Sequence, residues 1–437
     1  MSLGGGTFLT RNKVLPGAYI NFVSSTGTNE VLGSRGVVAI PLELDWGPDG
    51  LVFTITSEEF QKMAKPMLGY NHNHDKLKGI RDLFRNAIEV KFFRLMNSGI
   101  AASCTFGTAK CKGLRGNDIS IIIAVNVDDN SKFDVTTIFD GLEIETQTVA
   151  AASNLVNNDY IIWNSSATLA ATAGTAFTGG TNGVAITGTE YQAALDAFEA
   201  YQFDVLGCLS TDDTIKDTFV AYTKRLRDEN GVKFQTVVYK RETADYEGVI
   251  SVENNAKDAG ALESSLVYFV SGACAGVAIN ASITNKIYDG EFNVNVDYTQ
   301  TTLETALSVG KLMLHSVGDA VRILSDINTL TTYTTEKTED FSNNQTIRVI
   351  DQIANDIAHI FNTRYLGLKP NDNASRIGLW SELVSHHKEL ESLGAIENFN
   401  ASNITVEQGE DKKTVIVTDY ITPTNAMEQL YMTVVVQ

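Results

Sequence analysis

Residues 190–252 decide the fold: EYQAALDAFEAYQFDVLGCLSTDDTIKDTFVAYTKRLRDENGVKFQTVVYKRETADYEGVISV. Apolar residues recur at helical spacing over 190–201 and again over 214–231, and the second run ends at Asn230-Gly231, a pair that favours a helix C-terminus. Short apolar runs follow each helix, namely FDVLGCL, FQTVVY and GVISV. Helices that alternate with such strands are typical of βαβ units, so the stretch predicts an α/β domain with a parallel sheet.

The segments on either side have other patterns. Residues 25–99 mix strand-like runs at 33–44 and 89–95 with helical spacing over 53–67 and 76–87, which predicts a small α/β unit. From 100 to 165, strand-like runs separated by turn residues predict a β-sandwich or barrel insert. Two amphipathic helices, over 345–367 with Asn343 or Asn344 as cap and over 375–393, precede a predicted hairpin closed by QGEDKK.

The sequence therefore predicts an α+β multidomain protein with extended terminal arms. Its parts are an N-terminal arm with a strand (1–24), a small α/β domain (25–99), a β-rich, sandwich-like insert (100–165), a linker of small residues (166–189), an α/β parallel-sheet domain (190–335), a C-terminal α+β domain (336–421) and a C-terminal arm strand (422–437).

Composition argues against several classes of partner. The 437 residues carry a net charge of −19, which repels phosphate backbones and anionic lipid, so we expect no nucleic-acid and no membrane binding. The most apolar segment, 266–279, is too short to span a bilayer, which needs about 20 residues, and is expected to be a buried helix or strand–turn segment. The N-terminus lacks the apolar core of a secretory signal, and the four cysteines are scattered, which favours free thiols.

Motifs that would indicate catalysis or cofactor binding are incomplete. The Gly-rich run 177–183 is not followed by Lys and Ser/Thr, as a phosphate-binding loop requires. His72 and His74 beside Asp75 lack further ligands, and His386-His387 diverge on a helix. No G-x-S-x-G motif is present. We expect no enzyme, cofactor or metal; an α/β hydrolase-like enzyme with an unrecognised site and a surface adhesion module remain alternatives.

The closing stretch PTNAMEQLYMTVVVQ predicts a strand that is apolar on both faces. Leu430, Met432, Val434 and Val436 fall on one face, and the chain carries no charge after Glu428. Natural edge strands are usually protected by charge or proline. The strand therefore lies either inside its own domain or against another molecule, and the sequence pattern alone leaves both open.

Several phrases in fixed order carry a family resemblance. They are GLRGNDISIII (113–123), QTVAAASNLVNNDYIIW (147–163), FTGGTNGVAITGTEYQAALDAFEAYQFDVL (177–206), RLRDENGVKFQTVV (225–238), DYEGVISVENN (245–255), RVIDQIANDIAHIFNTRYLG (348–367) and AMEQLYMTVVV (426–436). Together they resemble the tail sheath proteins of contractile-tailed bacteriophages and of phage-tail-like bacteriocins, in the compact type found with Gram-positive hosts.

This resemblance implies a structural subunit that polymerises as stacked hexameric rings around an inner tube and contracts to drive the tube through a target envelope. The implied partners are further copies of the chain, the inner tail tube protein, and baseplate and tail terminator proteins. The implied location is a virion tail or tail-like particle, assembled in the cytoplasm of the bacterial host.

The resemblance also implies that both terminal arms add strands to a sheet in a neighbour's C-terminal domain, with segments such as 422–425 acting as flexible tethers. The strand-exchange residues would be Ala18, Ile20, Phe22, Leu430, Met432, Val434 and Val436. The C-terminal domain is expected to face the tube, and its helices offer the following polar candidates: Arg348, Lys369, Arg376, Lys388 and Glu391. A solvated helix face is the alternative interpretation of those five residues.

Overall fold

A seven-stranded sheet forms the centre of the protein. The computed structural model describes residues 34–436. The sheet order is β14-β13-β12-β11-β1-β3-β2, with all neighbours parallel except the edge strand β2, which is antiparallel to β3. The strands are β1 (Val37–Glu43), β2 (Val52–Thr56), β3 (Glu89–Leu95), β11 (Val205–Cys208), β12 (Gln235–Tyr239), β13 (Val249–Val252) and β14 (Lys311–Leu312). The parallel sheet predicted from residues 190–252 is confirmed.

Strand β1 joins two segments whose sequence patterns predict separate units. Val38 pairs with Val90 of β3 on one side and with Val205 of β11 on the other. Residues 25–99 therefore contribute strands to the same sheet as residues 190–335. The expected helix over 53–67 is wrong in its first part, because residues 52–56 find a hydrogen-bonding partner in β3 and form β2; the helix α1 covers Phe60–Leu68.

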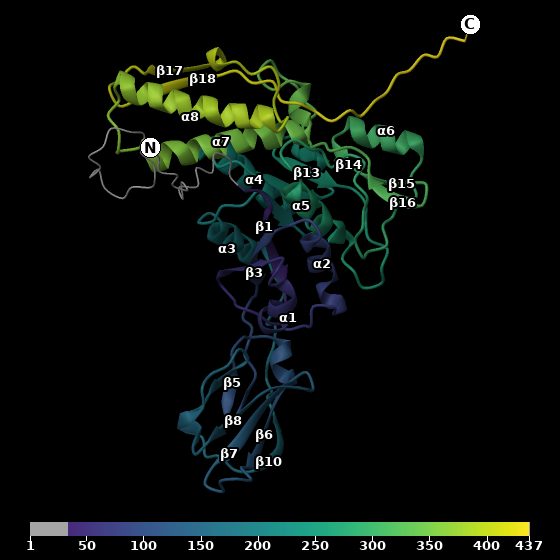
Figure 1. The fold of residues 1–437 in the computed structure, drawn as a ribbon. Coiled ribbons are helices and arrows are strands. Elements are labelled where there is room, and N and C mark those ends of the chain that lie inside the picture. The colour runs from purple at the N-terminus through teal and green to yellow at the C-terminus, as the bar shows by residue number, and fades with distance from the viewer. Residues whose placement is uncertain (1–33, 437) are drawn as a thin grey trace, which may run out of the picture.

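Helices cover both faces of the sheet (Figure 1). Val38 and Ile40 point to the face covered by α1, α2 (Lys78–Phe84) and α5 (Leu266–Gly276), whereas Ala39 points to the face covered by α3 (Gly188–Phe198) and α4 (Asp213–Lys224). Alternation along a strand produces these two separate cores. The segment 266–279 is thus largely a buried helix, as expected, and no helix of residues 34–436 is long and apolar enough to cross a membrane.

The β-rich insert lies at one end of the molecule (Figure 1). One of its sheets pairs β4 (Ser103–Cys104), β5 (Gly107–Ala109) and β9 (Ile161–Trp163). The other has the order β10-β6-β7-β8, from β10 (Thr172–Ala176), β6 (Ile119–Val125), β7 (Phe133–Phe139) and β8 (Leu142–Val149). Residues 166–189 are not a bare linker, because β10 completes the second sheet and Phe177 is buried in the insert's core.

The chain enters and leaves the insert through two adjacent segments. Asn97 bridges to Gly183 and Ile100 bridges to Thr181. A Cβ on Gly183 would lie 1.8 Å from the carbonyl oxygen of Asn97, and its φ is +82°, so glycine is needed there. Arg94 of β3 donates to the carbonyl oxygens of Gly47 and Lys112, both at 2.8 Å, and so attaches the insert to the central sheet.

The C-terminal domain forms a layer at the end of the molecule opposite the β-rich insert (Figure 1). It contains α7 (Asn344–Arg364), α8 (Asn373–Ser392) and the hairpin β17 (Ile404–Gln408) and β18 (Val415–Asp419). The side chain of Asn343 caps α7, as one of the two predicted candidates. The remaining elements are α6 (Gln300–Ser308) and the hairpin β15 (Leu314–Val317) and β16 (Ala320–Ile323).

A buried ion pair connects α7 to the central domain. Arg227, in a π-helical turn over Arg225–Glu229, lies 2.6 Å and 2.8 Å from the two carboxylate oxygens of Asp351 and donates to the carbonyl of Phe234 at 2.6 Å. Burial alone would lower the pKa of Arg227, but the charge and hydrogen bonds of Asp351 outweigh it, so that this pKa is raised and the guanidinium stays charged.

Replacing Asp351 by asparagine removes the carboxylate that is paired with the buried Arg227 charge. Removal of one partner of a buried pair costs about 3–5 kcal/mol, whereas an exposed pair contributes about 0–1 kcal/mol. Asp159→Asn at the exposed Lys110–Asp159 pair, with an N–O distance of 3.3 Å, is the control. We expect Asp351→Asn to lower the urea midpoint much more than Asp159→Asn; equal midpoints would contradict the role given to this ion pair.

Candidate functional site

Within the predicted C-terminal arm, residues 429–436 extend away from the body of the protein (Figure 1), and we call these residues the arm. Within residues 34–436 no strand pairs with it, although its pattern is that of a strand. Its large apolar side chains are 71–90% exposed: Leu430, Tyr431, Met432, Val434, Val435 and Val436. The sequence leaves open whether this segment pairs inside its own domain or with another molecule. In the described part of the structure it does not pair inside its own domain.

The segment before the arm is attached to the body, contrary to the expected flexible tether at 422–425. Glu397 N–H donates to the carbonyl of Thr422 at 2.9 Å, and Thr424 N–H donates to that of Ala395 at 3.0 Å. Ile396 forms an isolated bridge with Pro423. The sequence offers Thr, Pro and Asn, which are common in loops, and does not indicate these distant partners. We call residues 422–428 the arm root.

The hairpin β17–β18 presents an open strand edge. Tyr420 N–H donates to the carbonyl of Asn403, and Gly409 N–H donates to that of Thr414. Hydrogen-bonded pairs alternate along antiparallel strands, so Val415, Val417 and Asp419 direct their N–H and C=O groups away from β17. Among the described residues the sheet stops at β18, which leaves these groups available to another strand.

The other edge of the hairpin is partly covered. Trp380 of α8 donates from Nε1 to the outward carbonyl of Ile404 at 3.0 Å. Ile404 and Val406 pack on α8 and α7, while Val417, opposite Val406, remains 38% exposed. His387 of α8 lies behind β18, with Nε2 2.9 Å from Asp419 Oδ2. The apolar face of the hairpin therefore continues to its free edge.

The predicted strand-exchange residues divide into two groups. Leu430, Met432, Val434 and Val436 lie in the exposed arm, as described. Ala18, Ile20 and Phe22, together with the whole predicted N-terminal arm, lie outside the described residues. Within residues 34–436, the structure does not bring Leu430, Met432, Val434 or Val436 onto the hairpin of the same subunit.

The predicted tube-facing residues are not all on the surface. Arg348 is 1% exposed and pairs with Asp326 at 2.6 Å, so its assignment to a surface is wrong; the helical pattern places polar residues but does not reveal a buried partner. Lys369 and Lys388 are exposed. Arg376 is half-buried and donates to Asn371 Oδ1 at 2.8 Å, and half-buried Glu391 accepts from Phe399 N–H at 2.9 Å.

An apolar tip at the α7–α8 turn was not identified from the sequence. Leu366, Leu368 and Ile377 are 56–67% exposed there, next to Lys369. The signal was available, because two leucines flank Gly367 beyond the last turn of a long helix. Burial and the carboxylate of Glu382 raise the pKa of neighbouring Tyr365 to about 12, so its hydroxyl remains a hydrogen-bond donor, with Glu382 Oε1 at 2.9 Å.

The described residues do not gather the candidate metal ligands of the sequence into a cluster. Residues 34–436 contain no group of three or more His, Cys, Asp or Glu able to bind a metal ion. His74, a candidate ligand, instead accepts the N–H of Lys76. Two hollows of about 380 and 300 Å³ lie beside α6, and neither is lined by histidine or cysteine.

Comparison with protein families matches the chain in four consecutive parts. Residues 35–95 match the tail sheath protein domain III N-terminal region, 97–182 the phage tail sheath protein beta-sandwich domain, 184–329 the phage tail sheath protein central domain and 336–437 the phage tail sheath C-terminal domain.

Comparison with individual proteins agrees. The phage-like element PBSX protein XkdK of Bacillus subtilis is 30% identical over 99% of both chains. The crystal structure of a sheath tail protein from Desulfitobacterium hafniense is 36% identical, covers 95% of this chain and 99% of its own, and superposes with a TM-score of 0.81. The contracted helical sheath of the anti-feeding prophage shares the fold, with a TM-score of 0.58. It is 12% identical, and the match covers 97% of this chain and 99% of the sheath chain.

Chymotrypsin cleaves after large apolar residues in accessible chain. We expect brief treatment of the purified chain to cut after Leu430, Tyr431 or Met432 at least tenfold faster than after Tyr191, which is buried in the core. Mass spectrometry of the released C-terminal peptides measures this ratio. Resistance of the arm at a protease level that cuts the core would contradict its exposure.

Proposed function

Because the chain belongs to the phage tail sheath family, we propose that it is a subunit of a contractile sheath. The subunits polymerise as stacked hexameric rings around an inner tail tube. The sheath then contracts and drives that tube through a target envelope. The observation that carries the proposal is an unpaired apolar arm on a subunit that also has an open strand edge. We propose a structural role without catalysis, in a virion tail or tail-like particle assembled in the bacterial host cytoplasm.

Strand donation explains both features together. An added strand gains a ladder of backbone hydrogen bonds, and its side chains are buried in alternate pockets. Full burial of a Leu, Met or Val side chain contributes about 1.5–3 kcal/mol. We propose that residues 430–436 of one subunit pair with the free edge of β18 in a neighbour, beside Val417. The N-terminal arm, with Ala18, Ile20 and Phe22, is proposed as a second donor.

The geometry of such a contact favours a polymer over a closed dimer. Donor and acceptor are different surfaces of the same chain, so each subunit can give one strand and receive another. Heterologous contacts of this kind close into rings or continue as helices. The other partners that we propose are the inner tail tube protein and the baseplate and tail terminator proteins.

Tube contact is proposed for the C-terminal domain. Lys369 and Lys388 are exposed candidates, and the apolar tip of Leu366, Leu368 and Ile377 lies beside Lys369. Contraction would interchange two packings of rigid subunits that remain linked by the arms, with the contracted packing lower in free energy. Energy stored at assembly makes a nucleotide unnecessary, so contraction without added ATP is expected.

Deletion of the arm tests the function directly. We expect the full chain, at high concentration or with tube protein, to form rings or striated tubes in negative-stain electron microscopy. A chain ending at Glu428 keeps the arm root and should remain folded but unassembled, because the donor strand is gone. Compact particles from the full chain even with tube protein would overturn the sheath function; polymers from both chains would overturn arm donation.

The acceptor edge is tested by removal of one outward N–H group. Val417→Pro deletes a donor that faces away from β17, so the hairpin's own pairs remain while an incoming strand loses a hydrogen bond and meets the proline ring. Val417→Ala, which keeps the N–H, is the matched control. We expect at least tenfold less polymer by sedimentation from Val417→Pro than from Val417→Ala, with similar melting temperatures. Equal polymer yields would exclude this edge as the acceptor.

A further inference from the structure

The last charged residue of the chain binds the body of its own subunit. Glu428 accepts hydrogen bonds from Thr284 Oγ1 to Oε1 at 2.7 Å and from Ser325 Oγ to Oε2 at 3.1 Å. We propose that Glu428 is a latch that fixes where the donated strand leaves the subunit, and that the buried Asp326–Arg348 pair positions the two hydroxyls that bind it. This inference rests on the proposed donation of the arm.

The hydroxyl of Thr284 is oriented for this contact. Its Oγ1 accepts the backbone N–H of Asp326 at 2.9 Å. A hydroxyl has one proton, and the accepted bond fixes the direction of its lone pairs, so the proton points toward Glu428. Hydrogen bonds to an ionised carboxylate are stronger than neutral ones, which suits a single side chain that fixes a strand.

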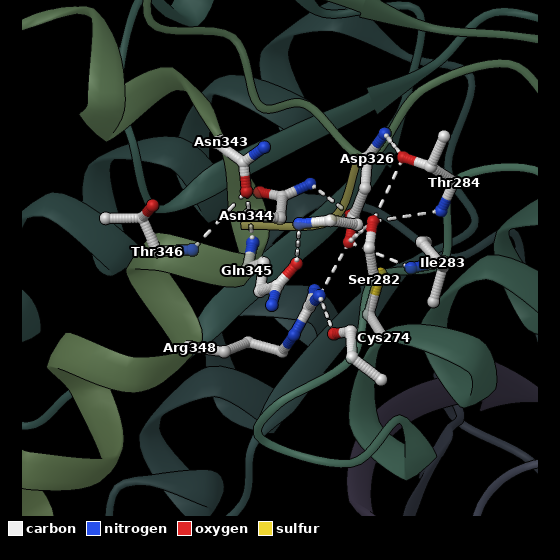
Figure 2. A network of polar contacts seen from close by, with 12 residues as sticks. Cys274, Ser282, Ile283, Thr284, Asp326, Asn343, Asn344, Gln345, Thr346 and Arg348 are labelled. Carbon is white, nitrogen blue, oxygen red and sulfur yellow. Dashed lines mark hydrogen bonds and ion pairs between the residues drawn. The ribbon is translucent and has the colours of Figure 1, made fainter. Parts of the chain in front are cut away.

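Asp326 fixes the two loops that supply the hydroxyls (Figure 2). Its carboxylate accepts from Ile283 N–H at 3.1 Å, from the Arg348 guanidinium at 2.6 Å and from Asn344 Nδ2 at 3.0 Å. Both Asp326 and Arg348 are buried. Thr284 follows Ile283 and Ser325 precedes Asp326, so the positions of both hydroxyls depend on the buried Asp326–Arg348 pair.

The start of α7 contacts the same part of the arm root. Ala426 N–H donates to Gln345 Oε1 at 3.0 Å, and Thr346 Oγ1 donates to Asn425 Oδ1 at 3.1 Å. Arg348, one turn further along α7, pairs with Asp326. Tension on a donated arm is therefore transmitted to α7 and to the Asp326 network rather than absorbed by a loose tether.

The latch also sets the reach of the arm. An extended chain spans about 3.3 Å per residue, so residues 429–437 reach about 30 Å beyond Glu428. If the chain were attached only at Thr424, four more residues would add about 13 Å of slack by the same measure. Glu428 thus determines which neighbours the donated strand can reach and from which direction.

Amide hydrogen exchange of the unassembled full chain tests the latch without polymerisation. In the wild type we expect slow exchange at Thr424 and Ala426 and fast exchange at Thr433. Glu428→Ala should raise the Ala426 rate at least tenfold while exchange of the core strands and the melting temperature stay unchanged, and Glu428→Gln should give an intermediate rate. Gln429→Ala, one residue beyond the latch, is the matched control and should leave Ala426 slow.

Two exchange results would overturn the latch: an Ala426 amide as fast as that of Thr433 in the wild type, or an Ala426 rate that Glu428→Ala does not change. Polymer yield then separates the latch from the function. If the full chain polymerises, the chain ending at Glu428 does not, and Glu428→Ala assembles as well as Gln429→Ala, arm donation stands and the latch is wrong. If Glu428→Ala assembles several-fold less than Gln429→Ala, the latch is supported.

Discussion

The architecture depends on the pairing of β1 with β3 on one side and with β11 on the other. Val38 lies beside Val90 and Val205, residues more than a hundred positions apart in the chain. Alternation along β1 then assigns Val38 and Ile40 to one core and Ala39 to the other. Because β1 is central, the chain between β3 and β11 must leave and return close to the same sheet, and this places the insert at one end.

Buried polar contacts extend this rigid centre to the C-terminal layer. Arg227 and Asp351 connect the π-helical turn after α4 with α7, and Asp326 and Arg348 connect the same helix with the loops before it. Leaving one member of such a pair alone in the interior is costly, so these contacts favour a single docking geometry. In the function that we propose, a body of this kind would move as a unit while its arm stays attached to a neighbour.

Local sequence patterns predicted an element correctly wherever residues close in the sequence determine its structure. The helix predicted over 345–367 is α7, although it ends at Arg364, and its cap is Asn343, one of the two predicted candidates. The hairpin around QGEDKK and the α+β multidomain class are confirmed. Predictions failed where a distant segment supplies the partner. Residues 52–56 became a strand because β3 pairs with them, and residues 172–176 became β10 because β6 does.

The candidate site shows the same division. By itself, the sequence determined that the closing strand is apolar on both faces and uncharged after Glu428, since period-two alternation and composition are local properties. Only the tertiary structure decided that this segment leaves the body unpaired, that its root is bound rather than flexible, and that Arg348 is buried against Asp326. The physical reason is that burial, hydrogen-bond partners and free strand edges are created by contacts between segments far apart in the chain, which no local pattern specifies.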